Sequence, residues 1–175
     1  CMVCFDGASV ENNRILFCDG CNAALHQRCY GVRRIPDGDF LCDRCQYLQQ
    51  EEAGGAPMCC LCPLKHGGLK PTTDGRWVHL CCALWSDHAV LLDLGEMGPV
   101  DVSRVRVQLP PETELACEHC RLQGGLLAPC AHSAPCSRVF HPLCAWFAGA
   151  FVGVQVSPPH THIPTYPHTH IPTYP

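Results

Sequence analysis

Three features of the sequence predict a small zinc-stabilised α+β protein with short two-stranded sheets and little regular structure. The 175 residues include 17 Cys and 11 His, both far above ordinary usage, whereas aromatic residues make up only 7%. The cysteines recur in Cys-x2-Cys steps, and histidines stand at fixed offsets from them. Pieces of about 40–60 residues bury too little surface to be secure alone, and bound metal is a common remedy.

Cysteine can stabilise a small domain through disulfides or through zinc, and the order of the residues favours zinc. A disulfide framework needs only thiols, usually in even number and behind a signal peptide. Here the number of cysteines is odd, no apolar segment opens the chain, and His accompanies Cys. No apolar run reaches the roughly 18–20 residues of a membrane span. We therefore expect a reducing compartment, the cytosol or nucleus, and no membrane partner.

The formal net charge of −4 argues against a strongly basic nucleic-acid-binding protein. Zinc makes the balance more negative, because four thiolates around one ion leave a net charge of about −2, and three thiolates with an imidazole about −1. A basic partner suits this negative electrostatic field best.

The Cys and His residues fall into three clusters, which we interpret as modules: Cys1 to Cys45, Cys59 to Cys82 and Cys117 to Cys144. The first gap, Gln46 to Pro57, ends in Gly, Ala and Pro and is typical of a short linker. In the second gap, the segment Val100 to Leu109 alternates apolar and charged residues, as a half-exposed strand does. We expect the second and third modules to pack together.

The last residues, 157–175, contain HTHIPTYP twice in succession. A short Pro-rich repeat has no packing period, so we expect a disordered or extended tail. Its four histidines suggest a metal site, but low-complexity sequence, or a translated nucleotide repeat, is the plainer interpretation. The first residue is already a candidate ligand, so we expect the chain to be a fragment of a longer protein.

The first cluster has the spacing C-x2-C-x13-C-x2-C-x4-H-x2-C-x12-C-x2-C, which supplies eight ligands for two tetrahedral sites. A C-x2-C step lets two sulfurs reach one ion at about 2.3 Å, and an imidazole nitrogen binds at about 2.0–2.1 Å. Because protein atoms hold every position, the sites are structural rather than catalytic. The ligands are Cys1, Cys4, Cys18, Cys21, His26, Cys29, Cys42 and Cys45.

This spacing, with the phrases ILFCDGCN, LHQRCYGV and IPDGDFLCDRC, closely resembles the PHD finger. The resemblance implies a tandem of cross-braced zinc fingers. A RING finger also cross-braces two zincs, but Phe40, two residues before a terminal Cys pair, matches the PHD aromatic. In the PHD arrangement one zinc binds Cys1, Cys4, His26 and Cys29, and the other binds Cys18, Cys21, Cys42 and Cys45.

The second cluster has the spacing C-x2-C-x16-H-x2-C and resembles the zinc knuckle that opens an extended PHD module. Cys60 and Cys81 adjoin its ligands and are rival donors. The spacing of the knuckle family leaves them as free thiols in small apolar niches. The ligands are then Cys59, Cys62, His79 and Cys82.

The third cluster supplies six of the eight ligands of a PHD finger, and VFHPLCA resembles the matching text of extended PHD fingers. Only Cys130 and Cys136 remain for a fifth site, because the last ligand pair of the family is missing. Two thiolates cannot close a tetrahedral site, and a Pro-rich repeat offers no packing to hold His160 or His162 as substitutes. Cross-bracing assigns the fourth complete site to Cys117, Cys120, His141 and Cys144.

The order of the modules resembles a tandem unit of chromatin proteins. Similar sequences occur in Jade-type and bromodomain-PHD-type scaffolds of histone acetyltransferase complexes and in trithorax-type histone methyltransferases. The resemblance implies a non-enzymatic, nuclear chromatin reader within an acetyltransferase scaffold, with a methyltransferase segment as the alternative. The chain then divides into a PHD finger (1–45), a linker (46–57), a zinc knuckle (58–90), a connector packed on the knuckle (91–116), an incomplete extended PHD finger (117–156) and the tail (157–175).

We expect a short strand with an exposed edge that can accept an extended peptide. Its residues are Arg14, Ile15, Leu16 and Phe17. The PHD resemblance implies that the peptide is the histone tail beginning Ala-Arg-Thr-Lys. It also implies that carbonyls of Pro36, Asp37 and Gly38 receive the free amino terminus of the tail. The alternative is an edge strand that meets only water.

Which methylation state of the tail lysine the finger recognises depends on the side chains that would surround that lysine. Fingers that recognise trimethyl-lysine usually place a Trp two residues before the His ligand, as one wall of a cation–π cage. Ala24 occupies that position here. We therefore predict a preference for unmodified lysine, helped by the carboxylates of Asp19 and Glu11.

Two other classes of function have weaker support. A catalytic zinc enzyme needs an open ligand position and a base, and no H-x-E with P-C-x-x-C and no H-E-x-x-H occurs. Weak, salt-sensitive DNA contact would supplement histone binding. Its candidate residues are Lys65, Lys70, Arg76, Arg104 and Arg106. Other subunits of a chromatin complex complete the expected partners.

Overall fold

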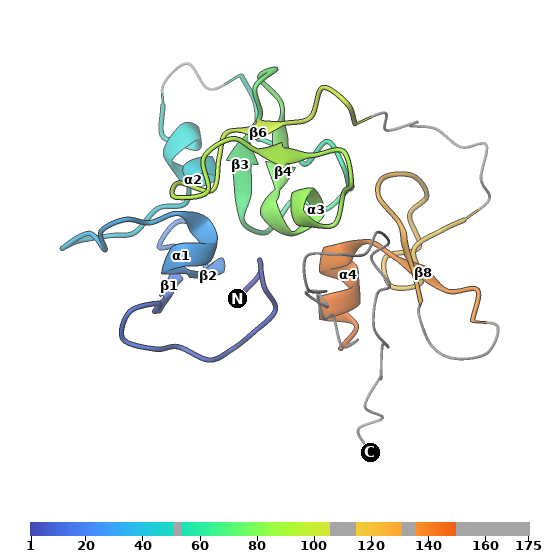
Figure 1. Ribbon diagram of the computed structural model, residues 1–175, viewed down its shortest axis with the longest axis horizontal. Helices are drawn as coiled ribbons and strands as arrows, with labels where there is room; N and C mark the ends of the chain where they lie inside the picture. The colour runs from blue at the N-terminus through green and yellow to red at the C-terminus, as the bar shows by residue number, and fades with distance from the viewer. Residues whose placement is uncertain (51–53, 106–114, 131–135, 150–175) are drawn as a thin grey trace, which may run out of the picture.

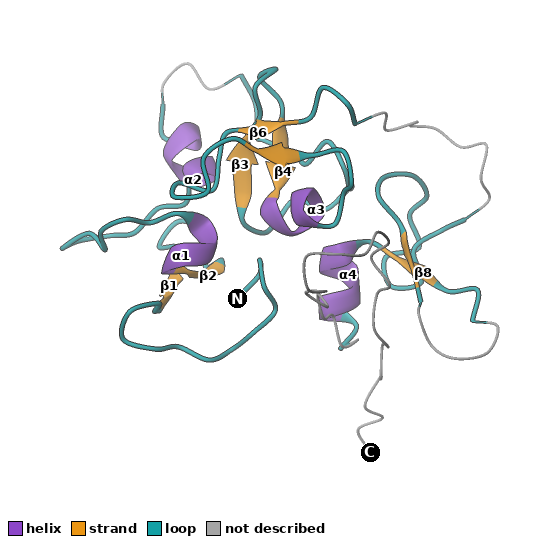
Figure 2. Ribbon diagram, in the orientation of Figure 1, coloured by secondary structure: helices purple, strands orange, loops and turns teal. Residues whose placement is uncertain are grey.

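The computed structural model describes residues 1–50, 54–105, 115–130 and 136–149, and these form short elements joined by loops (Figure 2). Four two-stranded antiparallel sheets pair β1 (Ile15–Phe17) with β2 (Ala24–His26), β3 (Leu69–Pro71) with β4 (Trp77–His79), β5 (Val90–Leu91) with β6 (Val100–Asp101), and β7 (Ala128–Pro129) with β8 (Val139–Phe140). The helices are α1 (Gln27–Tyr30), α2 (Asp43–Leu48), α3 (Leu80–Leu84) and α4 (Pro142–Phe147). The predicted fold class is confirmed.

One local arrangement occurs three times along the chain. A strand ends in a histidine or directly before one, and that histidine has extended backbone. A short helix begins at the next residue, and its third residue is a cysteine. The change from extended to helical backbone turns both side chains toward the same point. The three pairs are His26 with Cys29, His79 with Cys82, and His141 with Cys144.

The larger of two apolar clusters joins the modules. Leu25 and Tyr30 of the first finger are buried in the same cluster as Leu69 and Val100 of the knuckle region and Leu143 of the third module. Figure 1 shows α2 beside β3, so the knuckle packs directly on the first finger. A smaller cluster lies within the third module, around Phe140.

Glycines permit the close approach of the modules at several points, and Gly68 and Gly125 are two of them. A Cβ atom at Gly68 would lie 2.8 Å from the Leu25 side chain of the first finger. A Cβ atom at Gly125 would lie 2.6 Å from the Leu61 carbonyl oxygen, and the Leu126 N–H donates to that same oxygen at 2.6 Å. The second and third modules are therefore in contact, and α3 packs against α4.

The N-terminal segment reaches across to the third module (Figure 1). The rings of Phe5 and Trp146 stack with centroids 6.0 Å apart and an interplanar angle of 26°. This contact brings the first finger and α4 together, which the sequence did not lead us to expect.

The gaps between the modules differ from the expected linker and strand. Helix α2 extends to Leu48, and the Tyr47 ring lies 5.4 Å from that of Trp77. Of the strand expected over Val100 to Leu109, the described residues 100–105 form β6 and then a turn, in which Asp101 Oδ1 accepts the Ser103 N–H. Residues 51–53, 106–109 and the tail lie outside the described part.

Among the described residues, the structure has no helix that is long and apolar enough to cross a membrane.

Candidate metal centres

Cysteine and histidine side chains gather in four groups, and within each group the donor atoms lie within 4.8 Å of one another. Each group draws its members from segments far apart in the sequence, so it fastens those segments to one another. The groups are those that cross-bracing implies: Cys1, Cys4, His26 and Cys29; Cys18, Cys21, Cys42 and Cys45; Cys59, Cys62, His79 and Cys82; and Cys117, Cys120, His141 and Cys144.

The orientation of the imidazoles suits zinc. The Nδ1 atoms of His26, His79 and His141 face the thiols, at 3.2 Å from Cys4 Sγ, 3.2 Å from Cys62 Sγ and 3.4 Å from Cys120 Sγ. On the other side of the ring, His26 Nε2 donates to the Ala8 carbonyl at 2.8 Å, and His141 Nε2 donates to that of Gly124 at 2.9 Å. With the proton on Nε2, the Nδ1 lone pair points at the thiols, as a zinc ligand requires.

His79 is held differently. Its Nε2 atom is buried and has no hydrogen-bond partner. A Cβ atom at Gly67 would lie 2.9 Å from the ring carbon Cδ2 and 3.1 Å from Leu143. Packing, rather than a backbone carbonyl, therefore fixes this imidazole, and Gly67 supplies the room.

The thiols of each group share their protons unequally. The neighbouring Cys29 thiol, as hydrogen-bond partner, lowers the pKa of Cys4 to about 6. Burial opposes ionisation of Cys18, but the N–H groups of Cys42, Gly20 and Cys21 outweigh it and lower the pKa of Cys18 to about 7. The remaining thiols must donate to these anions, and the pKa of Cys29 rises for that reason. A divalent cation relieves this competition, so four-donor groups of this kind are zinc sites.

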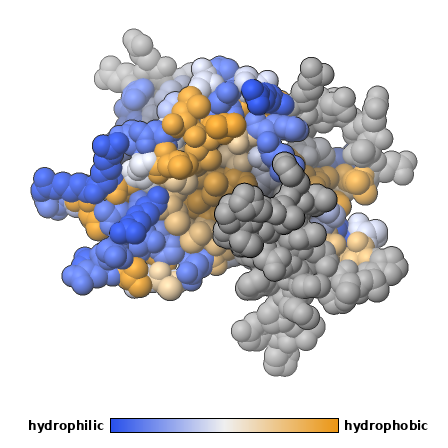
Figure 3. Space-filling model, in the orientation of Figure 1, coloured by the Kyte–Doolittle hydropathy of each residue, from blue (hydrophilic) through white to orange (hydrophobic). Residues whose placement is uncertain are grey.

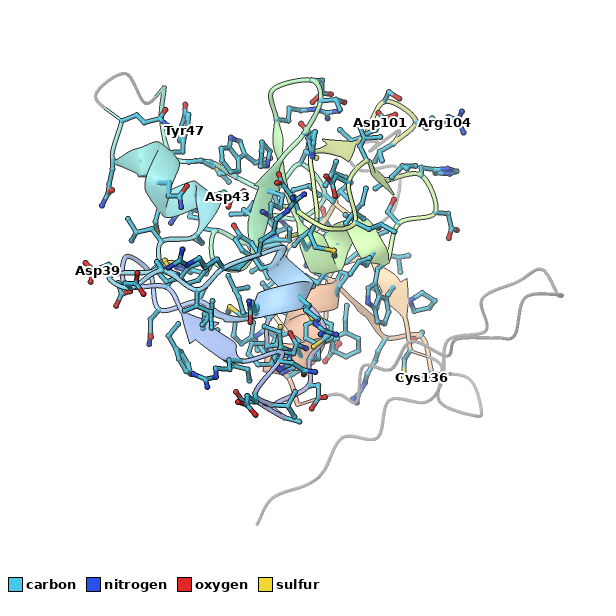
Figure 4. All side chains as sticks on the ribbon, turned by 60° about the vertical axis from the view of Figure 1, so that its left-hand side comes forward. Asp39, Asp43, Tyr47, Asp101, Arg104 and Cys136 are labelled. Carbon is cyan, nitrogen blue, oxygen red and sulfur yellow. The ribbon has the colours of Figure 1, made fainter. Side chains whose placement is uncertain are left out.

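Four cysteines stand outside these groups. Cys81 is buried, and Cys60 is half-buried in apolar surroundings, which raise the pKa of its thiol to about 11. Neither joins a four-donor group, although both adjoin one. Within the described residues, Cys130 and Cys136 also belong to no group of three or more donors. Figure 4 shows Cys136 at the outer end of the third module.

The predicted peptide edge lies on β1. The Gln27 N–H donates to the Arg14 carbonyl, and the Cys18 N–H donates to that of Ala23. In an antiparallel pair, the backbone N–H and C=O groups of successive residues point alternately toward the partner strand and away from it. Leu16 therefore faces β2, while the N–H and C=O groups of Ile15 and Phe17 face the free edge.

The loop that holds Pro36, Asp37 and Gly38 is joined to the C-terminal end of β1. The Asp19 N–H donates to the Phe40 carbonyl at 2.8 Å, and the Phe40 N–H donates to Asp19 Oδ2 at 2.7 Å. All three loop residues are exposed. The edge strand and the loop thus form one continuous surface.

Two of the five basic residues expected near DNA, Lys70 and Arg76, form ion pairs with acidic side chains of this chain. Lys70 is buried, with Nζ 3.0 Å from Asp43 Oδ2 and 4.3 Å above the centre of the Tyr30 ring. Arg76 pairs with Asp74 at 2.7 Å. Figure 4 shows Arg104 on the far side of the molecule from Asp39, and Arg106 lies outside the described residues.

Tyr30 joins the first finger to the knuckle. Its hydroxyl donates to the Leu69 carbonyl at 2.6 Å and accepts the Asp43 N–H at 2.9 Å. Burial raises the pKa of this phenol far above its ordinary value, so it stays protonated. One hydroxyl therefore pairs two backbone groups, one in each module.

We expect Tyr30→Phe to destabilise the zinc-loaded protein by about 1–3 kcal/mol, because a buried carbonyl and an N–H lose their partner. Tyr47→Phe is the matched control, since the Tyr47 hydroxyl accepts the N–H of Gly54, which is exposed. That change should cost about 0.5 kcal/mol or less. Urea unfolding with zinc in excess measures both, and equal losses would show that the hydroxyl of Tyr30 does not join the modules.

Comparison with known sequences shows two family matches. The family described as PHD-zinc-finger like domain matches residues 57–170. The family described as PHD-finger matches residues 12–46. Together they cover the first finger from residue 12 onward, the knuckle and the third module.

Relatives of two kinds align with most of this chain. Histone-lysine N-methyltransferase ATX2 of Arabidopsis thaliana is 39% identical over 153 residues, 87% of this chain and 14% of that protein. Bromodomain and PHD finger-containing protein 3 of Homo sapiens is 36% identical over 156 residues, 89% of this chain and 12% of that protein. The chain thus spans only a small part of the length of these relatives.

A solved structure has the same arrangement. The crystal structure of zebrafish PHF14-PZP superposes with a TM-score of 0.63 at 28% sequence identity, over 89% of this chain and 78% of that one. The joint packing of the three modules is thus shared with a solved structure.

Proposed function

Since this chain belongs to the PHD-zinc-finger-like family, we propose that it is a nuclear chromatin reader that docks the N-terminal histone tail on the free edge of β1. Its four Cys/His groups each hold one zinc, with the ligands named above. Four protein donors around each ion leave no open position, so we assign this segment no catalysis. The surrounding protein is a histone acetyltransferase scaffold or, alternatively, a trithorax-type methyltransferase, and the two relatives, at 39% and 36% identity, do not separate them.

The observation that carries the proposal is the bond pair between Asp19 and Phe40. These two bonds hold Phe40 at the end of β1, and the exposed residues Pro36, Asp37 and Gly38 come two to four residues before it, which supports a role for their carbonyls in receiving the amino terminus of the tail. A peptide whose amino terminus rests on that loop must run away from it, antiparallel to β1, toward Ile15. Backbone groups of Phe17 and Ile15 then supply the pairing, as in β-strand addition.

This direction assigns roles to the acidic residues. Asp19 stands at the loop end of β1, so its carboxylate meets the second residue of the tail, an arginine. The lysine lies two residues further, about 6.6 Å along the strand, beside the segment that contains Glu11. Glu11 therefore stands nearer to the lysine than Asp19 does.

The surface around the edge suits a basic, unmethylated tail. Figure 3 shows hydrophilic surface over the projecting loop that follows α1. Asp6, Glu11, Asp19, Asp37 and Asp39 are exposed in this finger. Ala24, opposite Phe17 in the sheet, provides no aromatic wall. An ammonium group keeps its hydrogen bonds here, whereas a trimethylammonium group gains no cation–π contact.

We expect a synthetic tail beginning Ala-Arg-Thr-Lys to bind at micromolar concentration, and trimethylation of its lysine to weaken binding about 10-fold, because charge-assisted hydrogen bonds are lost. Acetylation of its amino terminus should weaken binding at least as much. Asp19→Ala should lose about 10-fold or more, since the carboxylate also fixes Phe40. Isothermal titration calorimetry measures these values.

Asp87→Ala is the control for the Asp19 change, because Asp87 is an exposed carboxylate on the knuckle. It should leave the affinity unchanged. Tighter binding of the trimethylated tail would sink the assignment to unmodified lysine, and absence of binding to every tail peptide would sink the reader function itself.

A further inference from the structure

The free edge of β1 is already capped at one end. The Ile15 N–H, which points away from β2, donates to Ser9 Oγ at 3.0 Å. An oxygen at that distance and direction stands where the carbonyl oxygen of an added strand would have to lie. A docked peptide and the Ser9 hydroxyl therefore cannot both bind the same N–H group.

The segment that carries Ser9 is fixed on both sides. The preceding carbonyl, of Ala8, accepts the Nε2–H of the zinc ligand His26 at 2.8 Å. After Ser9, Val10 bridges to Asn13, whose side-chain oxygen accepts the Arg28 N–H at 2.9 Å. Ser9 is thus held against β1 by contacts with a metal centre and with α1, and the cap belongs to the folded state.

We propose that Ser9 ends the docking edge at Ile15 and so limits the length of tail that the protein can pair with; this inference rests on the reader function proposed above. The groups that remain open are the Ile15 carbonyl and both backbone groups of Phe17. A tail residue opposite Phe17 exchanges two hydrogen bonds. The residue opposite Ile15 can only donate its N–H, and its carbonyl must turn away from β1.

The consequence is a limit on recognition by backbone pairing. Residues beyond the one opposite Ile15 gain no ladder bond, so they add little affinity however the tail continues. Selectivity is concentrated on the first few residues of the tail, between the loop at Pro36 and the cap at Ser9. Ser9 is a positioning residue in this sense, because it acts through the strand rather than on a tail side chain.

The test compares tail peptides of increasing length, from four to eight residues, by calorimetry on the wild type, Ser9→Ala and Ser9→Thr. For the wild type, affinity should stop rising once the peptide reaches Ile15. In Ser9→Ala the Ile15 N–H is free, and the longer peptides should bind about 3- to 10-fold more tightly than they bind the wild type, as one added net hydrogen bond predicts. The shortest peptide should bind both equally, and Ser9→Thr, which keeps a hydroxyl, should match the wild type.

A second measurement separates the cap from the fold. Amide hydrogen exchange at Ile15 should be faster in peptide-free Ser9→Ala than in the wild type, and a long peptide should restore its protection. Ser86→Ala is the matched control, because Ser86 Oγ accepts the His88 N–H on the knuckle, far along the chain from β1.

The outcomes are distinguishable. If the tail binds both proteins with the same dependence on length, Ser9 is no cap and the inference fails, while the reader function stands. If Ile15 exchanges equally fast in both peptide-free proteins, the inference fails as well. If no tail peptide binds the wild type or the variant, the reader function fails and the inference fails with it.

Discussion

Native mass spectrometry of the folded chain should show four tightly bound zinc ions, and their removal with a chelator should unfold all three modules. The groups at Cys1, Cys18, Cys59 and Cys117 each fasten distant segments. Zinc binding to such structural sites contributes on the order of 10–16 kcal/mol, more than the net stability of a domain this small. Circular dichroism during chelation, followed by readdition of zinc, measures the effect.

Magnesium in excess is the control for the chelation experiment, because it prefers oxygen ligands and should not restore the fold. Near-native circular dichroism after complete zinc removal would contradict the structural role of the metal. A firmly bound fifth zinc, lost on changing His160 and His162 to Ala, would contradict the interpretation of the tail as a low-complexity repeat.

Gly31→Ala should be the most damaging change of a single small residue outside the zinc ligands. Gly31 ends α1 with φ at +74°, and a Cβ atom there would overlap the backbone of Glu96 in the segment after the knuckle. Left-handed backbone costs a residue other than glycine about 1–2 kcal/mol, and overpacking adds about 1–3 kcal/mol. Together these costs predict a loss of about 2–5 kcal/mol in urea unfolding.

Gly75→Ala provides the matched control for Gly31. Gly75 has φ at +83°, but nothing lies within 4 Å of a Cβ atom placed there. It should show only the conformational cost of about 1–2 kcal/mol. If the two variants lose the same stability, the contact between the first finger and Glu96 does not hold the modules together.

The metal groups could be predicted from sequence because their rules are local. Two cysteines three residues apart, or a histidine and a cysteine three residues apart, can bind one ion in only a few geometries. At His26 and His79 the strand ends and a helix begins, which brings the histidine and the cysteine three residues later to one point. The cross-bracing itself came from the resemblance to the PHD finger. The incomplete pair Cys130 and Cys136 likewise follows from counting donors.

The contact of the second module with the third was expected and is present, but the individual contacts between modules could not be predicted in this way. Lys70 has the same sequence signature as any exposed lysine, and only the folded chain shows it buried against Tyr30 and Asp43. Gly31 and Gly68 resemble ordinary loop glycines until a neighbouring module occupies the space beside them. The role of Ser9 was missed for the same reason, because its partner, the Ile15 N–H, is a backbone group that leaves no signal in the sequence.

The stack of Phe5 on Trp146 has a consequence for how the protein would meet a nucleosome. Two binding surfaces on a flexible linker sample many separations, and their second contact forms at an effective concentration set by that sampling. Here the β1 edge and α4 are parts of one packed body, so no such averaging occurs. A tail captured at β1 presents the third module at one distance and one angle. Any second contact made by the third module would therefore form at one fixed spacing from a tail bound at β1.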